Sequence, residues 1–145
     1  VLIEIICDTI HLCPEMITLV FKHRSIDRMM LITDSMAASW MPDGPYDLAE
    51  MKVRVENGEA RLDSGALAGS TLRYHLGVRN VHEITKIPLE ALTRASGYNQ
   101  AQSLGLEGVG EIAPGSPADV VIVDHDFQPV AVFVDGEDKL PAALA

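Results

Sequence analysis

The sequence predicts an α/β fold in which parallel strands share one sheet. Residues 1–7 and 29–33 are nearly continuous apolar runs, which are typical of parallel strands covered on both faces. Helical periodicity lies between them, as the crossover between two parallel strands requires. Further along, residues 46–63 carry the alternating pattern of an antiparallel hairpin. The chain is therefore predicted to begin with a βαβ unit and to continue with a hairpin.

The first predicted helix begins at Pro14, a residue that suits the first helical turn. Four of its residues recur at helical spacing and are expected to fall on one face of the helix. These residues are Met16, Leu19, Val20 and His23.

The hairpin is predicted around Asn57-Gly58, a dipeptide preferred in two-residue turns. Apolar and charged residues alternate on both sides of it. The apolar positions are Val53, Val55, Ala60 and Leu62.

Three helices and a β-rich tail are predicted after the hairpin. The helices cover residues 71–82, a segment from Pro88 to a stop at Gly97, and residues 99–104. In the first helix, Leu72, Leu76 and Arg79 recur at helical spacing. In the second, Leu89, Leu92 and Ala95 are expected to face inward. Two β-rich runs, 119–124 and 130–135, are joined by a turn and form the edge of a separate β module.

Composition narrows the classes of function. The 145 residues carry a net charge of −10, which disfavours nucleic acids and anionic membranes as partners. No apolar run reaches the roughly 18 residues that a membrane-spanning helix needs. Cys7 and Cys13 do not make a disulfide framework, so we expect a cytoplasmic location. Because Val1 starts inside an apolar run, we expect the chain to be part of a longer protein.

Two polar sites follow the predicted parallel strands. Asp34 comes directly after residues 29–33, and His11 follows residues 1–7. Active sites of parallel barrels lie at the carboxyl ends of the strands, so these side chains can converge on one substrate. Asp34 could act as a general base toward water and then as a general acid. The alternatives are a turn-forming or capping role for Asp34 and a capping role for His11.

Four stretches in order resemble a known family. They are "CDTIHLCPE", "LITDSMAASWMPDGPYDL", "VENGEARLDSGALAGSTL" and "GEIAPGSPADVVIVDHDFQPVAVFVDG". Together they resemble the C-terminal part of the N-acetylglucosamine-6-phosphate deacetylases, which belong to the amidohydrolase superfamily. The resemblance runs from about residue 3 to residue 137.

The resemblance implies the C-terminal portion of a (β/α)8 TIM-type barrel with a hairpin insertion, plus part of a small β-sandwich domain. Residues 1–105 would belong to the barrel, with the hairpin at about 46–63. Residues 106–145 would supply the C-terminal strands of the sandwich. The resemblance also implies a homodimer of the full-length protein.

The resemblance further implies hydrolysis of the acetamide of N-acetylglucosamine 6-phosphate to glucosamine 6-phosphate and acetate. Asp34 matches the family's catalytic acid and base, and His11 matches a histidine that contacts the substrate. Residues 67–70 match a loop beside the sugar pocket, although a plain turn before a helix is the alternative. These residues are Leu67, Ala68, Gly69 and Ser70.

The family uses a divalent metal ion, with zinc or iron expected, whose ligands lie on earlier strands. None of those ligands matches a residue of this chain, so the isolated 145 residues are expected to be inactive. Cys7, His11 and Cys13 do not follow a known zinc spacing. Two alternatives remain open: a non-catalytic truncated fragment, or an amidohydrolase acting on a different amino sugar or amide.

Several positions depart from the family pattern. Thr9 stands in place of a usual glycine, and this bears on the geometry of the loop that carries His11. The other departures are Cys13 for histidine, Gln100 for proline and Trp40 for a small residue.

Overall fold

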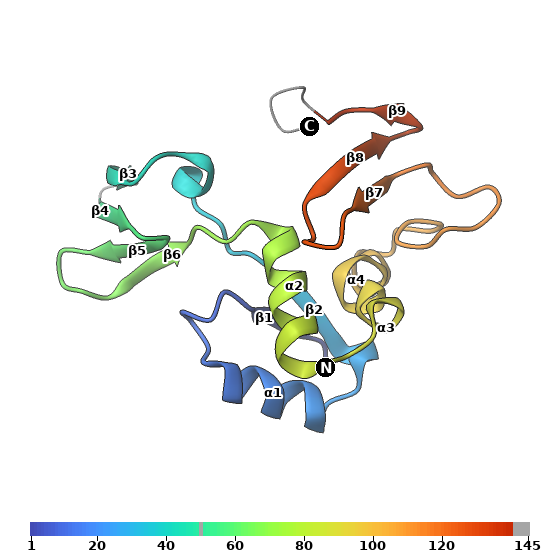
Figure 1. The fold of residues 1–145 in the computed structure, drawn as a ribbon, viewed down its shortest axis with the longest axis horizontal. Helices are drawn as coiled ribbons and strands as arrows, with labels where there is room; N and C mark the ends of the chain where they lie inside the picture. Colours follow the sequence, from blue (N-terminus) through green and yellow to red (C-terminus); the bar gives the residue numbers. More distant parts are fainter. Residues whose placement is uncertain (50, 141–145) are drawn as a thin grey trace.

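A computed structural model describes residues 1–49 and 51–140 and confirms the α/β class. The elements in chain order are β1 (Ile3–Ile6), α1 (Pro14–His23), η1 (Ile26–Arg28), β2 (Met29–Ile32), η2 (Ala37–Trp40), β3 (Gly44–Leu48), β4 (Met51–Glu56), β5 (Glu59–Leu62), β6 (Leu67–Ser70), α2 (Tyr74–Thr85), α3 (Leu89–Thr93), the π-helical η3 (Arg94–Tyr98), α4 (Asn99–Leu104), β7 (Val120–Val123), β8 (Pro129–Val134) and β9 (Glu137–Asp138). Figure 1 shows three separate β regions, with α2 near the centre of the molecule.

The predicted βαβ unit is confirmed. Strands β1 and β2 pair in parallel, with Ile3 opposite Met29 and Ile6 opposite Ile32. Helix α1 lies below this pair and α2 lies across it (Figure 1). Side chains from both strands and from the helices form one core: Ile5, Cys7, Ile17, Phe21, Met29, Leu31, Val81, Leu92 and Ala95. Burial of this apolar surface is the main favourable contribution to folding here.

The buried face of α1 is not the face that the sequence analysis picked out by helical spacing. Ile17 and Phe21 are the buried residues of this helix, whereas Met16 and Leu19 are 42% and 50% exposed. Val20, from the predicted set, is partly buried against the core. His23, also from that set, is exposed. Apolar residues lie on more than one side of α1, so helical spacing alone does not determine which side faces the strands.

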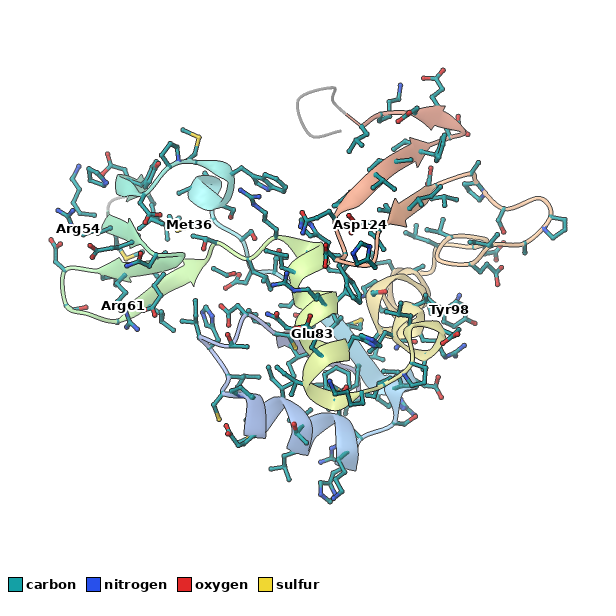
Figure 2. All side chains as sticks on the ribbon, in the orientation of Figure 1. Met36, Arg54, Arg61, Glu83, Tyr98 and Asp124 are labelled. Carbon is teal, nitrogen blue, oxygen red and sulfur yellow. The ribbon has the colours of Figure 1, made fainter. Side chains whose placement is uncertain are left out.

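The hairpin is confirmed and belongs to a larger sheet. The order β3-β4-β5-β6 is antiparallel throughout, so residues 67–70 form a strand rather than a plain turn. Asn57 and Gly58 have φ angles of 52° and 79°, the left-handed pair that a tight hairpin turn requires. Met36 lies between η2 and this sheet (Figure 2). It packs with four buried residues of the second core: Ala38, Val53, Val55 and Ala60.

Helix α2 begins at Tyr74, three residues later than predicted. Its buried residues are Gly77 and Val81, whereas Leu76 and Arg79, which recur at helical spacing, are half-buried. Leu72 is 9% exposed, but it lies before the helix. Leu72 packs closely on Gly77, since a Cβ atom there would lie 3.1 Å from the Leu72 Cδ2 atom. Sequence spacing counts apolar side chains and cannot register a glycine that is buried by close packing.

Gly97 does not stop the next helix, contrary to the prediction. Helix α3 continues through the π-helical segment into α4, which ends at Gly105 with φ of 67°. Leu92 and Ala95 are fully buried, as predicted, whereas Leu89 is 42% exposed. A left-handed glycine is a common helix terminator, and here it is the later glycine that adopts this conformation.

The tail forms the third sheet, in the order β7-β8-β9. The two predicted runs are confirmed as antiparallel β7 and β8, and β9 was not predicted. Several apolar side chains of this sheet are exposed: Val121, Ile122, Val123, Val130 and Val134. The last part of the predicted second domain, 141–145, lies outside the described residues. Within the described ranges, every helix is too short or too polar to cross a membrane.

Candidate active site

Asp34 follows β2 directly and is held there by the hairpin sheet. The backbone N–H of Ser70 donates to the Asp34 carbonyl at 3.1 Å, and the Met36 N–H donates to the Ser70 carbonyl at 2.9 Å. Ser35 and Ser70 thereby form a short parallel bridge. Asp34 itself is exposed and adopts a left-handed φ of 51°. The backbone that follows the Asp34 side chain is therefore held by two hydrogen bonds to Ser70.

Gly69 makes this contact possible. A Cβ atom at this position would lie 3.7 Å from the Asp34 carbonyl oxygen and 3.8 Å from the Met36 Cβ. The contact is not itself a clash, but φ is +125°, a conformation that L-residues rarely adopt. Leu67 and Ala68 are half-buried earlier in the same strand, and Ser70 is 2% exposed. The structure therefore brings the predicted segment 67–70 against Asp34.

Two hydroxyl groups whose hydrogen bonds the sequence did not predict connect the backbone segments of this region. The Ser35 hydroxyl donates to the Leu72 carbonyl at 2.7 Å. The Ser39 hydroxyl donates to the Met36 carbonyl at 2.6 Å and is buried. The run of small residues after Asp34 was the available signal, because small hydroxyl residues bond to nearby backbone in turns.

His11 lies in the loop after β1 and contacts Asp8. One Asp8 oxygen, Oδ1, accepts the backbone N–H groups of Ile10 and His11 at 2.9 and 2.8 Å. The other, Oδ2, lies 2.6 Å from Nδ1 of the His11 ring. Thr9 has φ of 67°, which explains why glycine suits this position in the resembling family. The signal for Asp8 was its place three residues before His11, a spacing typical of side-chain-capped turns.

His11 and Asp34 follow neighbouring parallel strands, so they lie at the same edge of the strand pair. Among the described residues no hydrogen bond joins them. A substrate, rather than a direct contact, would have to connect the two side chains.

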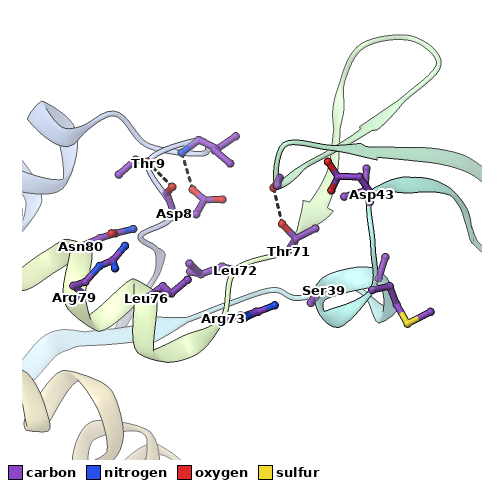
Figure 3. Close-up of a pocket in the computed structure, with 15 residues that line it drawn as sticks. Asp8, Thr9, Ser39, Asp43, Thr71, Leu72, Arg73, Leu76, Arg79 and Asn80 are labelled. Carbon is purple, nitrogen blue, oxygen red and sulfur yellow. Dashed lines mark hydrogen bonds between the residues drawn. The ribbon is translucent and has the colours of Figure 1, made fainter. Parts of the chain in front are cut away.

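A cavity of about 430 Å³ lies beside this edge (Figure 3). Asp8 and Thr9 line it from the β1 loop, and Arg79 and Asn80 line it from α2. Asp34 and His11 are not among its lining residues. The Arg73 guanidinium, which also lines the cavity, stacks 4.3 Å from the centre of the Trp40 ring.

Charge and burial make this part of α2 unfavourable for a further positive charge. Burial lowers the pKa of His75, and the neighbouring Arg73 and Arg79 lower it further. The Nε2 atom of His75 and the Nε atom of Arg79 are buried without a hydrogen bond to the described residues. Arg79 Nε lies 3.9 Å from Glu83, which is too far for a hydrogen bond.

The described residues do not fit a metal ion by themselves. Within residues 1–49 and 51–140, no group of three His, Cys, Asp or Glu side chains is placed to hold one. Burial and the neighbouring Asp8 raise the pKa of the Cys7 thiol to about 12. Since metals bind the thiolate form, Cys7 is a buried apolar residue here rather than a ligand.

The fold is similar to part of the amidohydrolase fold. The amidohydrolase family matches residues 17–138, and the chain belongs to this family. The family is generally metal-dependent.

Particular relatives narrow the comparison. The chain is 42% identical over 84% of its length to an N-acetylglucosamine-6-phosphate deacetylase from Lysinibacillus sphaericus, of which the match covers 32%. It is 39% identical over 93% of its length to an N-acetylgalactosamine-6-phosphate deacetylase from Escherichia coli O157:H7, of which the match covers 36%. The chain thus spans about a third of the length of these relatives.

A solved structure resembles the chain in fold, and it is of the same enzyme as the first of these relatives. The crystal structure of an N-acetylglucosamine-6-phosphate deacetylase from Thermotoga maritima superposes with a TM-score of 0.91 and 39% identity. The match covers 95% of this chain and 38% of that one.

Proposed function

We propose that this chain is part of an enzyme that hydrolyses the acetamide of N-acetylglucosamine 6-phosphate. The products are glucosamine 6-phosphate and acetate. The observation that carries the proposal is the placement of Asp34 at the end of β2, where the Ser70 bridge fixes its peptide. Similarity to deacetylases over most of the chain supports the choice of reaction.

In this mechanism Asp34 is both the base and the acid. Its carboxylate removes a proton from the water whose oxygen bonds to the acetamide carbon. When the carbon–nitrogen bond breaks, the same side chain delivers the proton to the departing amine. His11 binds the substrate from the neighbouring strand end, and residues 67–70 border the sugar. A rigid support matters because a misplacement of about 1 Å can cost on the order of 100-fold in rate.

The full-length enzyme is proposed to carry a divalent metal ion, zinc or iron. Since the described residues do not supply a three-ligand group, the ligands would come from segments outside this chain. Elemental analysis of the purified full-length protein tests this proposal. A protein that is active after complete removal of divalent metals would contradict it.

The function is tested with Asp34→Asn in the full-length protein. The amide keeps the shape of the carboxylate but cannot accept the proton, so kcat should fall by at least about 100-fold. Asp63→Asn is the matched control, because Asp63 is an exposed carboxylate between β5 and β6. Release of glucosamine 6-phosphate is the measurement. Equal rates in the two variants would refute the role of Asp34.

Three relatives are named for a second amino sugar, and they support an alternative substrate. The 39%-identical relative is named for N-acetylgalactosamine 6-phosphate, which differs from the glucosamine compound in the orientation of the C4 hydroxyl. The ratio of kcat/KM values for the two substrates decides between them. A ratio in favour of the galactosamine compound would replace the substrate proposed above without changing the chemistry.

We further propose that residues 1–105 form the C-terminal part of a (β/α)8 barrel and that 106–145 supply strands of a small β-sandwich. The parallel β1–β2 pair and the separate sheet β7-β8-β9 support this division. An experimental structure of the full-length protein should show β1 paired on its other side with a further parallel strand. An unpaired β1 edge there would contradict the barrel.

A cytoplasmic homodimer is the proposed setting. The free thiols Cys7 and Cys13 support a reducing compartment. Light scattering of the full-length protein tests the assembly, and fractionation of cells tests the location. A monomer, or protein recovered outside the cytoplasm, would contradict the corresponding part.

A further inference from the structure

Asp8 and His11 form a close side-chain pair that the proposed acid–base role of Asp34 does not involve. The Asp8 side chain is only 6% exposed, and the His11 side chain is 22% exposed. Asp8 uses both oxygens on the same residue: Oδ1 accepts the His11 backbone N–H at 2.8 Å, and Oδ2 lies 2.6 Å from the ring nitrogen Nδ1. The aspartate therefore holds the backbone and the ring of His11 together.

The chemistry of the two side chains indicates which ring nitrogen of His11 carries the hydrogen atom. An ionised carboxylate has no hydrogen to donate, so the ring must donate from Nδ1. In a neutral imidazole only one nitrogen carries hydrogen, and Nε2 is then an acceptor. Among the described residues nothing hydrogen-bonds to Nε2 of His11.

The loop is anchored from outside as well. The Asn80 side chain, on α2, donates to the Cys7 carbonyl at 2.8 Å, directly before Asp8. Figure 3 shows Asn80 beside the loop that carries Asp8 and Thr9. The carboxylate therefore approaches the ring from a backbone that is itself tied to a helix.

We propose that Asp8 is a positioning residue that keeps His11 in the Nδ1–H tautomer, so that Nε2 presents an acceptor to a hydrogen-bond donor of the substrate. The identity of that substrate, an amino-sugar phosphate with several hydroxyl groups, rests on the proposed function. The tautomer itself does not. A hydrogen-bond partner on one ring nitrogen commonly sets the role of the other.

The variant Asp8→Asn separates this role from simple loop formation. The amide oxygen can still accept the backbone N–H groups of Ile10 and His11. The amide nitrogen, which replaces Oδ2, can only donate to the ring, so His11 must change to the Nε2–H tautomer. The matched control is Asp124→Asn. Asp124 lies in the turn between β7 and β8 (Figure 2), and its Oδ1 accepts two backbone N–H groups at 2.9 and 2.8 Å.

The first measurement is the ¹⁵N spectrum of the histidine rings in the full-length protein, with the His11 signals assigned through His11→Asn. We expect hydrogen on Nδ1 in the wild type and in Asp124→Asn, and hydrogen on Nε2 in Asp8→Asn. A wild-type ring with hydrogen on Nε2 overturns the proposal, even if Asp8→Asn does not fold. An unchanged tautomer in a folded Asp8→Asn protein also overturns it.

The second measurement is kinetic. Asp8→Asn should lower kcat/KM by roughly 10- to 100-fold, the usual loss when the partner of a functional histidine is changed. Adding Asp8→Asn to His11→Asn should cause little further loss, since both changes remove one interaction. Full additivity would overturn the proposal. If the wild type does not hydrolyse the substrate, the proposed function fails while the tautomer measurement still tests Asp8.

Discussion

Cys7 and Cys13 flank the loop that carries His11, and they occupy opposite environments. Cys7 is 1% exposed within the core, whereas Cys13 is exposed at the start of α1. Burial is the main cause of the raised pKa of Cys7, about 12, and the negative charge of Asp8 adds to it. Only the thiolate reacts with alkylating reagents. The two cysteines are therefore expected to differ in reactivity although they lie close together in the sequence.

This contrast predicts selective labelling. At pH 8, iodoacetamide should modify Cys13 in the native protein and leave Cys7 unmodified, because Cys7 is both protonated and inaccessible. Peptide mass spectrometry measures the two sites in one sample. In urea both cysteines should react, and this control shows that the sequence around Cys7 does not itself prevent labelling. Rapid labelling of Cys7 in the native protein would show that this core opens.

At the scale of elements, the contact between Gly110 and the π-helical segment η3 fixes a loop to a helix. A Cβ atom at Gly110 would lie 2.8 Å from the Tyr98 Cα and 3.0 Å from the Gly97 carbonyl carbon. Both are backbone atoms and cannot rotate away. Gly110 also has φ of +83°, which a second glycine, Gly115, matches with +92° and open space around it.

Gly110→Ala should therefore destabilise the protein more than Gly115→Ala. The two variants share the cost of a side chain at positive φ, and the difference measures the clash. We expect the free energy of unfolding to fall by about 1–3 kcal/mol more for Gly110→Ala, the usual cost of overpacking. Thermal unfolding of the full-length variants, followed by circular dichroism, is the measurement. Equal losses would mean that the loop moves away from η3 without cost.

Some helices, strands and turns could be predicted from the sequence, and others could not. The parallel pair and the Asn57-Gly58 turn were predictable, because continuous apolar runs and a left-handed dipeptide have few alternatives. The buried side of α1 was not, since its apolar residues permit several rotations. Gly97 was predicted as a stop, but it lies within η3, and that packing against Gly110 is not visible in local sequence.

The candidate site also combines features that the sequence predicted with features that it did not. Asp34 was singled out by its place after a predicted strand and residues 67–70 by resemblance, and the structure brings their backbones into contact. Asp8 was noted only as a neighbour of His11. Its role depends on which oxygen reaches which nitrogen, a geometry that spacing alone does not specify.

At the scale of the whole molecule, we propose that this chain supplies only part of the active site. It carries the proposed acid and base, but its described residues do not group three metal ligands. We therefore expect the isolated 145 residues to show no deacetylation when zinc or iron is added. The full-length protein under the same conditions is the control. Measurable turnover by the isolated chain would require a metal site that these side chains do not form in the structure.

The bridge between Ser35 and Ser70 has a consequence for protein engineering. The four-stranded sheet could be considered a unit for exchange between relatives, since it enters the chain after η2 and leaves it before α2 (Figure 1). However, its last strand shares two backbone hydrogen bonds with the segment that begins at Asp34. A graft that shifts this register by one residue would re-aim the carboxylate. The exchangeable unit is therefore the sheet together with residues 34–36.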